Sequence, residues 1–258
     1  MAFMRRNDMT YENKIKEIDE FKKKIDKHRP FDKHTLEQLK EYYRIGLTYS
    51  SNALEGNSLT ETETKIVLED GITIGGKPIR DHYEALGHSE AYDLLYRLAK
   101  TTVITEKDIL ELHRLFYYRI DQPKAGHYRK EKVIITGTDF IPPPPSRVPA
   151  LMKKFILDIP KMRKKYHPVE FSALLHKEFV ARHPFVDGNG RAARLLMNLA
   201  LLQNGYVITI IPPVLRNDYI NAIKKTQIEP KTDIPFINFI SAMVYESMLD
   251  YLRLLNAL

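Results

Sequence analysis

Twelve residues in the second half of the chain combine several side chains that could act on a phosphate. The stretch from His183 to Arg194 has the sequence His-Pro-Phe-Val-Asp-Gly-Asn-Gly-Arg-Ala-Ala-Arg, and leucines with helical spacing follow it as far as Asn204-Gly205. Asp187-Gly188-Asn189-Gly190 therefore lies at the N-terminus of a helix, where unpaired backbone N–H groups and the helix dipole attract anions. The glycines leave room for a phosphate. We predict an anion-binding loop here.

The side chains around this loop suggest what it does to the anion. Arg191 and Arg194 are three residues apart, so they share a helix face and can grip a polyphosphate together. Asp187 is the loop's carboxylate, and beside bound phosphates one carboxylate suits Mg²⁺. His183 comes just before, and we expect Pro184 to keep it extended. A neutral imidazole can accept the proton of an incoming hydroxyl group. A base, a metal ligand and an anion site are thus contiguous.

Each part has a plainer interpretation when taken alone, because Asp-Gly-Asn-Gly is a common turn and a histidine near a helix end often caps it or lies in the core. Together, however, residues 183–194 resemble the motif of the Fic family, HPFx(D/E)GNGRxxR, at every defined position. The resemblance implies an enzyme that uses Mg²⁺ to transfer AMP from ATP to a hydroxyl side chain of a target protein, releasing pyrophosphate. Relatives that transfer phosphate or phosphocholine tend to depart from Gly-Asn-Gly, so AMP transfer is favoured.

The resemblance also assigns a role to each residue. His183 would be the general base, Asp187 the Mg²⁺ ligand and Arg194 the clamp on the γ-phosphate. Arg191 would contact another phosphate. The anion site itself would be formed by Gly188, Asn189 and Gly190. Tyr219, in a later helix, would border the adenine, although a core aromatic is an equally good interpretation.

A second motif ends an expected helix over residues 34–54. Ser51 and Glu55 are four residues apart and project from one face of the last turn. By itself this is an ordinary solvated pair, but Ser51 to Gly56 resembles the autoinhibitory motif of the family, [S/T]xxxE[G/N]. The resemblance implies that Glu55 pairs with Arg194, displaces the γ-phosphate and turns the α-phosphate out of line. Ser51 would steady this inhibitory helix.

The segment from Val133 to Ile141 predicts the chain's β structure, with two branched runs around Gly137 that end at four prolines. Alone, a hairpin here could be a simple connector. In the Fic family the equivalent segment is a flap whose backbone edge pairs with the target. The resemblance therefore implies target docking at Ile134, Ile135, Thr136 and Gly137.

The apolar periodicity elsewhere predicts helices. The pattern indicates an all-α fold, a Fic-type helical bundle with one short β-hairpin flap. Thr60 with Glu63 and Thr105 with Asp108 are expected to begin two of the helices. We expect an N-terminal helical module over residues 1–104, containing the inhibitory helix, and a catalytic core over residues 105–258. Further helices are expected near 11–28, 82–99, 149–165, 168–182, 214–224 and 234–255.

Composition limits the other possibilities. The 258 residues are 43% hydrophobic and 28% charged, enough for a proper core, and no run approaches the ~20 apolar residues of a membrane span. We see no signal peptide and no cysteine, which fits a cytoplasmic protein without disulfides. The lysines and arginines that give the net charge of +7 are mixed with carboxylates along the chain. We therefore expect solvated helix faces rather than direct nucleic-acid binding. A basic surface could also steer ATP or an acidic target.

Several alternatives remain open from sequence. The same site could remove AMP from a modified protein, with Glu55 orienting a water molecule. The chain could instead be a regulatory module that binds nucleotide without turnover, although such a module needs no base at His183. Self-modification is expected beside target modification. Relatives often dimerise, so the oligomeric state is open between monomer and homodimer, as are the target, the releasing signal and the preference for ATP.

Overall fold

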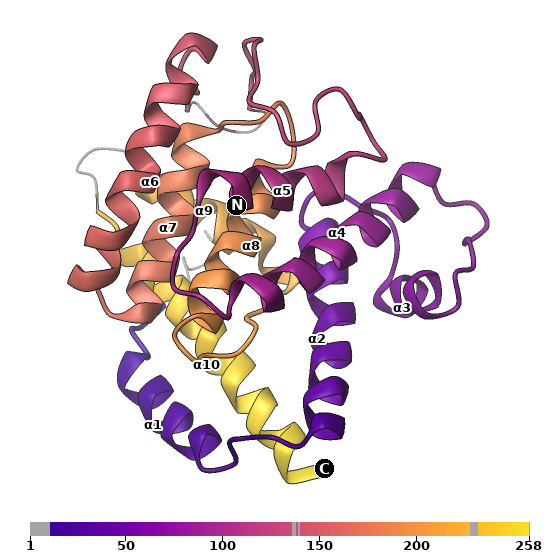
Figure 1. The fold of residues 1–258 in the computed structure, drawn as a ribbon, viewed down its shortest axis with the longest axis vertical. Coiled ribbons are helices and arrows are strands. Elements are labelled where there is room, and N and C mark those ends of the chain that lie inside the picture. The colour runs from indigo at the N-terminus through magenta and orange to yellow at the C-terminus, as the bar shows by residue number, and fades with distance from the viewer. Residues whose placement is uncertain (1–10, 136–137, 139, 228–231, 258) are drawn as a thin grey trace, which may run out of the picture.

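The computed structural model describes residues 11–135, 138, 140–227 and 232–257. In this part of the chain it contains ten α-helices, two short 3-10 turns and no strand, so the predicted all-α class is confirmed (Figure 1). The helices are α1 (Ile15–Asp26), α2 (Lys33–Ala53), α3 (Glu61–Glu69), α4 (Ile79–Leu98), α5 (Glu106–Tyr117), α6 (Val148–Lys165), α7 (Pro168–Arg182), α8 (Asn189–Leu202), α9 (Arg216–Lys225) and α10 (Ile234–Ala257).

Local sequence signals explain where several helices begin and end. Helices α3 and α5 both open with capping boxes. In each, the side chain of Thr60 or Thr105 accepts the backbone N–H of the residue three positions later, and the carboxylate of that residue accepts the backbone N–H of the threonine. Gly205, with φ of 75°, follows the end of α8. The predicted helix boundaries therefore agree with the structure to within a few residues.

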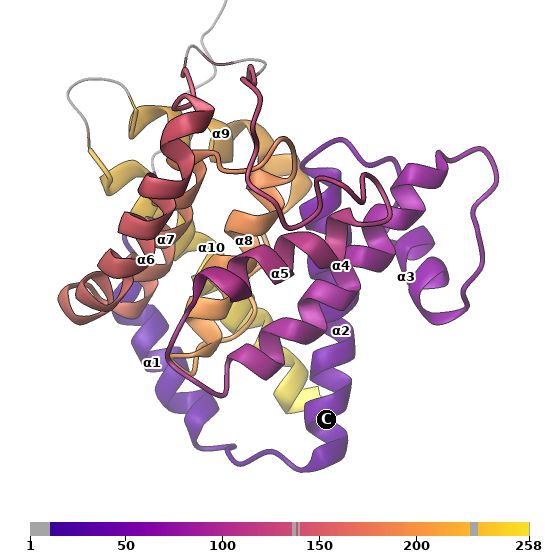
Figure 2. The same cartoon turned by 45° about the horizontal axis from the view of Figure 1, so that its top comes forward.

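Helix α8 lies at the centre of the bundle, in contact with α2, α4, α5 and α7. Figure 2 shows it enclosed by these neighbours. Four of its five leucines are buried, as are both of its arginines. The helix that follows the anion loop is thus held from several sides, and the loop at its N-terminus has little freedom to move.

One hydrophobic core runs through most of the bundle. It includes Ile18 and Ile25 of α1, Leu47 of α2, and Phe239 and Val244 of α10, and α1 packs directly against α10. A smaller cluster of Leu59, Val67 and Ala85 lies beside α3. The core thus joins both sides of the division at residues 104 and 105, and that division stays a prediction.

The predicted β-hairpin is not seen. Residues 131–135, 138 and 140 carry no strand, while Thr136 and Gly137 lie outside the described residues. Ile134 is 93% exposed, and the segment rises above the bundle without a sheet beside it (Figure 2). Two short strands with no third strand are only marginally stable in water, which explains the difference.

As for membranes, no helix among the described residues is long and apolar enough to span one.

Candidate active site

The loop before α8 has the geometry of an anion site at a helix N-terminus. Gly188 caps α8 with φ of 76°, and a Cβ there would lie 2.6 Å from the ring of Phe116, so only glycine fits. The Asn189 side chain accepts a hydrogen bond from the Phe185 N–H and donates one to the Phe185 carbonyl, both at 2.9 Å. Asn189 therefore fixes the loop's shape, and the free N–H groups at the start of α8 remain to meet a phosphate.

His183 ends α7 in the left-handed conformation, with φ of 46°, rather than the extended conformation expected before Pro184. Its N–H donates to the carbonyls of Phe179 and Val180, so the helix-ending hydrogen bonds outweigh the restriction from proline. Burial and the nearby Arg129 lower the pKa of His183 to about 4. Within the described chain its Nδ1 is buried without a hydrogen-bond partner. The imidazole is thus neutral near pH 7 and able to accept a proton.

Asp187 is half-exposed beside the anion loop. Its Oδ1 accepts the Gly188 N–H at 2.6 Å, and its Oδ2 accepts Arg80 Nη2 at 2.8 Å. The described residues contain no group of three His, Cys, Asp or Glu side chains that could hold a metal ion. Because Mg²⁺ beside phosphates needs only one or two carboxylates, Asp187 fits a metal whose other ligands come from nucleotide and water.

His113 supports this loop from below, a role that sequence reasoning missed. Its Nδ1 accepts the Gly126 N–H at 2.9 Å, so the neutral ring carries its proton on Nε2 and donates it to the Asp187 carbonyl at 3.1 Å. The ring stacks on Phe185 with centroids 3.7 Å apart. Burial lowers the pKa of His113 to about 3, which keeps this tautomer uncharged. His113 thereby joins the anion loop to the segment around Gly126.

Arg194 is almost fully buried and is held by the end of α2. Its Nη2 lies 2.7 Å from Glu55 Oε1 and donates to the Ser51 carbonyl, while its Nε donates to Ser51 Oγ at 3.0 Å. Burial opposes ionisation of Glu55, but the Arg194 guanidinium outweighs it, and the pKa of Glu55 is lowered. The structure thus brings together Ser51, Glu55 and Arg194. Glu55 also abuts Gly190, so its carboxylate stands at the mouth of the anion loop.

Arg191 faces a different set of groups. Its Nη1 lies 2.9 Å from Glu84 Oε1 on α4, its Nη2 lies 3.5 Å from Asp187 Oδ2, and its guanidinium covers the ring of Phe116. The two arginines of the motif are therefore anchored by separate carboxylates. Glu84 gave no signal in the sequence, because it is 107 residues from Arg191 and lies in an ordinary helical pattern.

Tyr219 lies in the core, which is one of the two interpretations that the sequence left open. It is 3% exposed, and its hydroxyl accepts from Arg194 Nη1 at 3.3 Å and donates to His176 Nε2 at 2.8 Å. Burial raises the pKa of Tyr219, so the phenol stays protonated. Tyr219 thus supports Arg194 from behind.

Arg129 links the predicted flap to the backbone of His183. Its Nε donates to the His183 carbonyl at 2.8 Å, its own N–H donates to the Pro184 carbonyl, and its terminal nitrogens donate to the carbonyls of Glu131 and Pro143. Both ends of the exposed segment are therefore fastened to the backbone around the imidazole.

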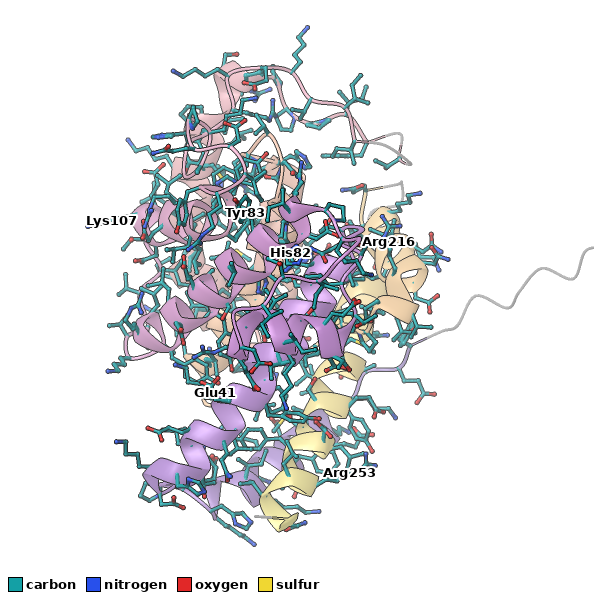
Figure 3. The ribbon with its side chains drawn as sticks, turned by 90° about the vertical axis from the view of Figure 1, so that its right-hand side faces the viewer. Glu41, His82, Tyr83, Lys107, Arg216 and Arg253 are labelled. Carbon is teal, nitrogen blue, oxygen red and sulfur yellow. The ribbon has the colours of Figure 1, made fainter. Side chains whose placement is uncertain are left out.

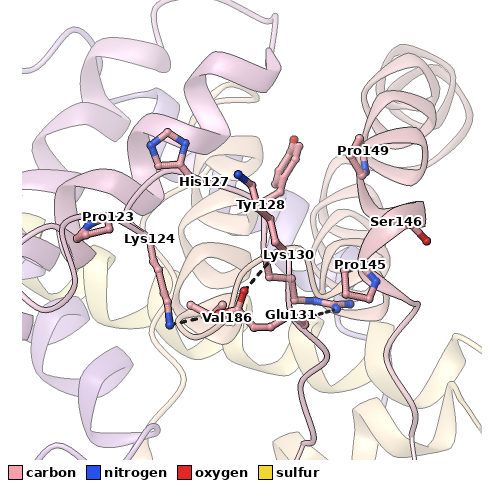
Figure 4. Close-up of a pocket in the computed structure, with 11 residues that line it drawn as sticks. Pro123, Lys124, His127, Tyr128, Lys130, Glu131, Pro145, Ser146, Pro149 and Val186 are labelled. Carbon is pink, nitrogen blue, oxygen red and sulfur yellow. Dashed lines mark hydrogen bonds and ion pairs between the residues drawn. The ribbon is translucent and has the colours of Figure 1, made fainter.

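A groove of about 830 Å³ has Val186 of the motif loop in its lining (Figure 4). The segment from Pro123 to Glu131 forms one wall, and Lys124 and Glu131 form an ion pair of 3.2 Å within it. Pro145, Ser146 and Pro149 form the facing wall, at the start of α6. The groove therefore lies between the two segments that flank the predicted flap, with Val186 of the motif loop in its lining.

Comparison with known proteins agrees with this geometry. The model of the Fic/DOC family matches residues 103–201. A Fic domain containing signaling protein from Bacteroides thetaiotaomicron is 30% identical, with a TM-score of 0.80 over 91% of this chain and 94% of that chain. The chain belongs to the Fic/DOC family. Fic-1 of C. elegans (residues 134–508) is 26% identical, with a TM-score of 0.83 over 94% of this chain and 72% of that one.

Several curated relatives are Fic proteins of Drosophila. The "Protein adenylyltransferase Fic" of Drosophila mojavensis and that of Drosophila melanogaster are each 38% identical over 207 residues, or 79% of this chain. The matched part is 40% of the first protein and 41% of the second. The chain thus spans about two fifths of the length of these curated Fic proteins.

Proposed function

We propose that this Fic protein transfers AMP from ATP to a hydroxyl side chain of a target protein and of itself, and that Glu55 restrains the transfer. The observation that carries the proposal is the buried Arg194, held by Glu55 at 2.7 Å beside the anion loop. Support also comes from the Drosophila relatives, which are named protein adenylyltransferases. The division into an N-terminal module and a core belongs to the same proposal.

The chemistry follows from the placement of the chain's own groups. His183 would accept the proton of the target hydroxyl while the hydroxyl oxygen bonds to the α-phosphorus of ATP. The bond between the α-phosphorus and pyrophosphate would break, and pyrophosphate would leave. The N–H groups at the start of α8 would stabilise the phosphate charge that develops. Bound with ATP at Asp187, Mg²⁺ would neutralise phosphate charge. No step requires a covalent intermediate on the protein.

The restraint has a simple physical basis. A guanidinium that already donates to Glu55 and Ser51 has no free fork for the γ-phosphate. The Glu55 carboxylate, next to Gly190, would also repel phosphate oxygens. ATP would therefore bind weakly or with its α-phosphate out of line, and in-line geometry supplies much of the rate of such reactions.

Two labelled forms of ATP test the reaction class. The Glu55→Gly protein is incubated with Mg²⁺ and ATP labelled on either the α- or the γ-phosphate, and protein-bound label is counted. AMP transfer predicts label from the α-phosphate alone. Label from the γ-phosphate would show phosphorylation instead. No label from either, together with clear ATP binding, would support a regulatory module without turnover.

A further inference from the structure

The Asp187 carboxylate has a partner on α4 that lies outside the Fic motif. Arg80 Nη2 lies 2.8 Å from Asp187 Oδ2, and Arg80 Nε lies 3.1 Å from Glu84 Oε1. Arg80 is 53% exposed in its side chain, whereas Glu84 is buried. An arginine from the N-terminal part of the chain thus reaches the residue that the proposed function assigns to Mg²⁺.

These contacts close a ring of alternating charges. Arg80 bridges Asp187 and Glu84, and Arg191 bridges the same two carboxylates from the buried side, at 3.5 and 2.9 Å. The remaining Asp187 oxygen accepts the Gly188 N–H. Glu84 Oε2 accepts from Asn57. Both Asp187 oxygens are therefore occupied by donors in this state.

We propose that Arg80 is a positioning residue that competes with the divalent metal ion for the Asp187 carboxylate; this inference rests on the proposed function. A metal ion bound to the Asp187 carboxylate and a guanidinium on the same carboxylate repel each other, so each weakens the binding of the other. Arg191 is 1% exposed and its guanidinium is held in the core by Glu84 at 2.9 Å and over the ring of Phe116, so it has no room to move away. Arg80 is half-exposed and keeps Glu84 as a partner, so Arg80 is the group that exchanges.

This competition is separate from the restraint by Glu55. Glu55 occupies Arg194, which would hold the γ-phosphate, while Arg80 occupies the carboxylate that would hold the metal. Removing one leaves the other in place. A half-exposed ion pair has only modest energy. We therefore expect loss of Arg80 to increase the factor by which Mg²⁺ tightens ATP binding by about two- to fivefold.

The test measures how much Mg²⁺ tightens ATP binding. All proteins carry His183→Ala and Glu55→Gly, so that ATP is neither consumed nor displaced. Calorimetry gives the Kd of ATP in EDTA and in Mg²⁺. The readout is the Kd in EDTA divided by the Kd in Mg²⁺. Arg80→Gln is compared with Arg97→Gln, an exposed arginine on the same helix, about 25 Å away along its axis. Both variants lose one positive charge.

We expect Arg80→Gln to raise the ratio two- to fivefold and Arg97→Gln to leave it unchanged. In an Asp187→Ala background the effect of Arg80→Gln should vanish, because its partner is gone. An equal weakening of ATP in both media would make Arg80 a phosphate contact and overturn the proposal. An unchanged ratio in a folded Arg80→Gln protein would also overturn it. No ATP binding in any variant would overturn the proposed function as well.

Discussion

At the scale of single residues, the proposed reaction depends on an imidazole that stays neutral. Burial and Arg129 hold the pKa of His183 near 4, so the ring is unprotonated from pH 6 to 8. A protonated ring cannot accept the hydroxyl's proton. The contribution of His183 to the rate should therefore be flat above about pH 5 and fall as the pH drops through its pKa.

The first prediction replaces this base. His183→Ala should reduce AMP transfer by at least a hundredfold, because general-base catalysis contributes about 10²- to 10⁴-fold, while ATP binding persists. Transfer is measured in the Glu55→Gly background, and ATP affinity by calorimetry. His34→Ala, at an exposed position on α2, is the matched control. If transfer survives in His183→Ala at the control rate, His183 is not the base.

The residues that sequence reasoning found and those that it missed differ in a physical way. His183, Asp187, Arg191 and Arg194 are contiguous, so helix geometry and charge predicted that they would lie together. Arg80 precedes Asp187 by 107 residues, and Glu84 and His113 also reach the loop from distant helices. Such contacts depend on packing, which no local pattern encodes.

At the scale of helices, the end of α2 that carries Glu55 is linked to α9. Arg216 Nε donates to the carbonyl of Leu54, the residue between the end of α2 and Glu55, at 2.8 Å. Figure 3 shows Arg216 at the edge of the bundle, with Arg253 far from it near the C-terminus. The same view shows His82, whose Nε2 accepts the Ile74 N–H and so fastens the loop before α4. Distant helices thus fix the positions of Glu55 and Arg80.

The second prediction weakens the link between α2 and α9. Arg216→Gln should raise AMP transfer by roughly two- to tenfold, since one hydrogen bond contributes about 0.5–1.5 kcal/mol. The increase should disappear in the Glu55→Gly background, where nothing remains to be held. Arg253→Gln, an exposed arginine of α10, serves as the control. Equal activation with and without Glu55 would show that Arg216 acts elsewhere than on the restraint.

Helices were predictable because their signals are local. Capping residues such as Thr60 and Thr105 and the spacing of apolar residues act within a few turns, and the structure keeps them. The predicted hairpin is not formed in the described residues. Two short strands need a further strand beside them to be stable, and the described residues contain no strand that could pair with Val133 to Ile141. The left-handed turn at His183 also escaped, since it arises from the end of α7 as a whole.

At the scale of the whole molecule, buried histidines link stability to pH. Burial lowers the pKa of His88 and His113 to about 3 and that of His183 to about 4, against 6.5 when exposed. The unfolded chain therefore binds more protons than the folded chain between about pH 4 and 6.5. The sign is then fixed, because the free energy of unfolding falls as the pH falls through this window.

The third prediction follows from this linkage. Urea unfolding at pH 5 should give a free energy of unfolding lower than at pH 7 by about 1–2 kcal/mol for each buried histidine. His113→Gln should have a lower stability at pH 7 but a smaller loss on acidification. Carboxylates with lowered pKa values lose their contribution mainly below this window, so they do not mimic the effect. Stability that stays flat from pH 7 to 5 would contradict the burial of these rings.

The central claim is that Glu55 restrains AMP transfer by holding Arg194, and intact-mass spectrometry tests it most directly. Three proteins are incubated with ATP and Mg²⁺: the wild type, Glu55→Gly, and Glu55→Gly combined with His183→Ala. The intact mass of each is then measured. We predict the added mass of AMP in Glu55→Gly, much less in the wild type, and none in the double variant. The same extent of AMP addition in the wild type and in Glu55→Gly would contradict the account.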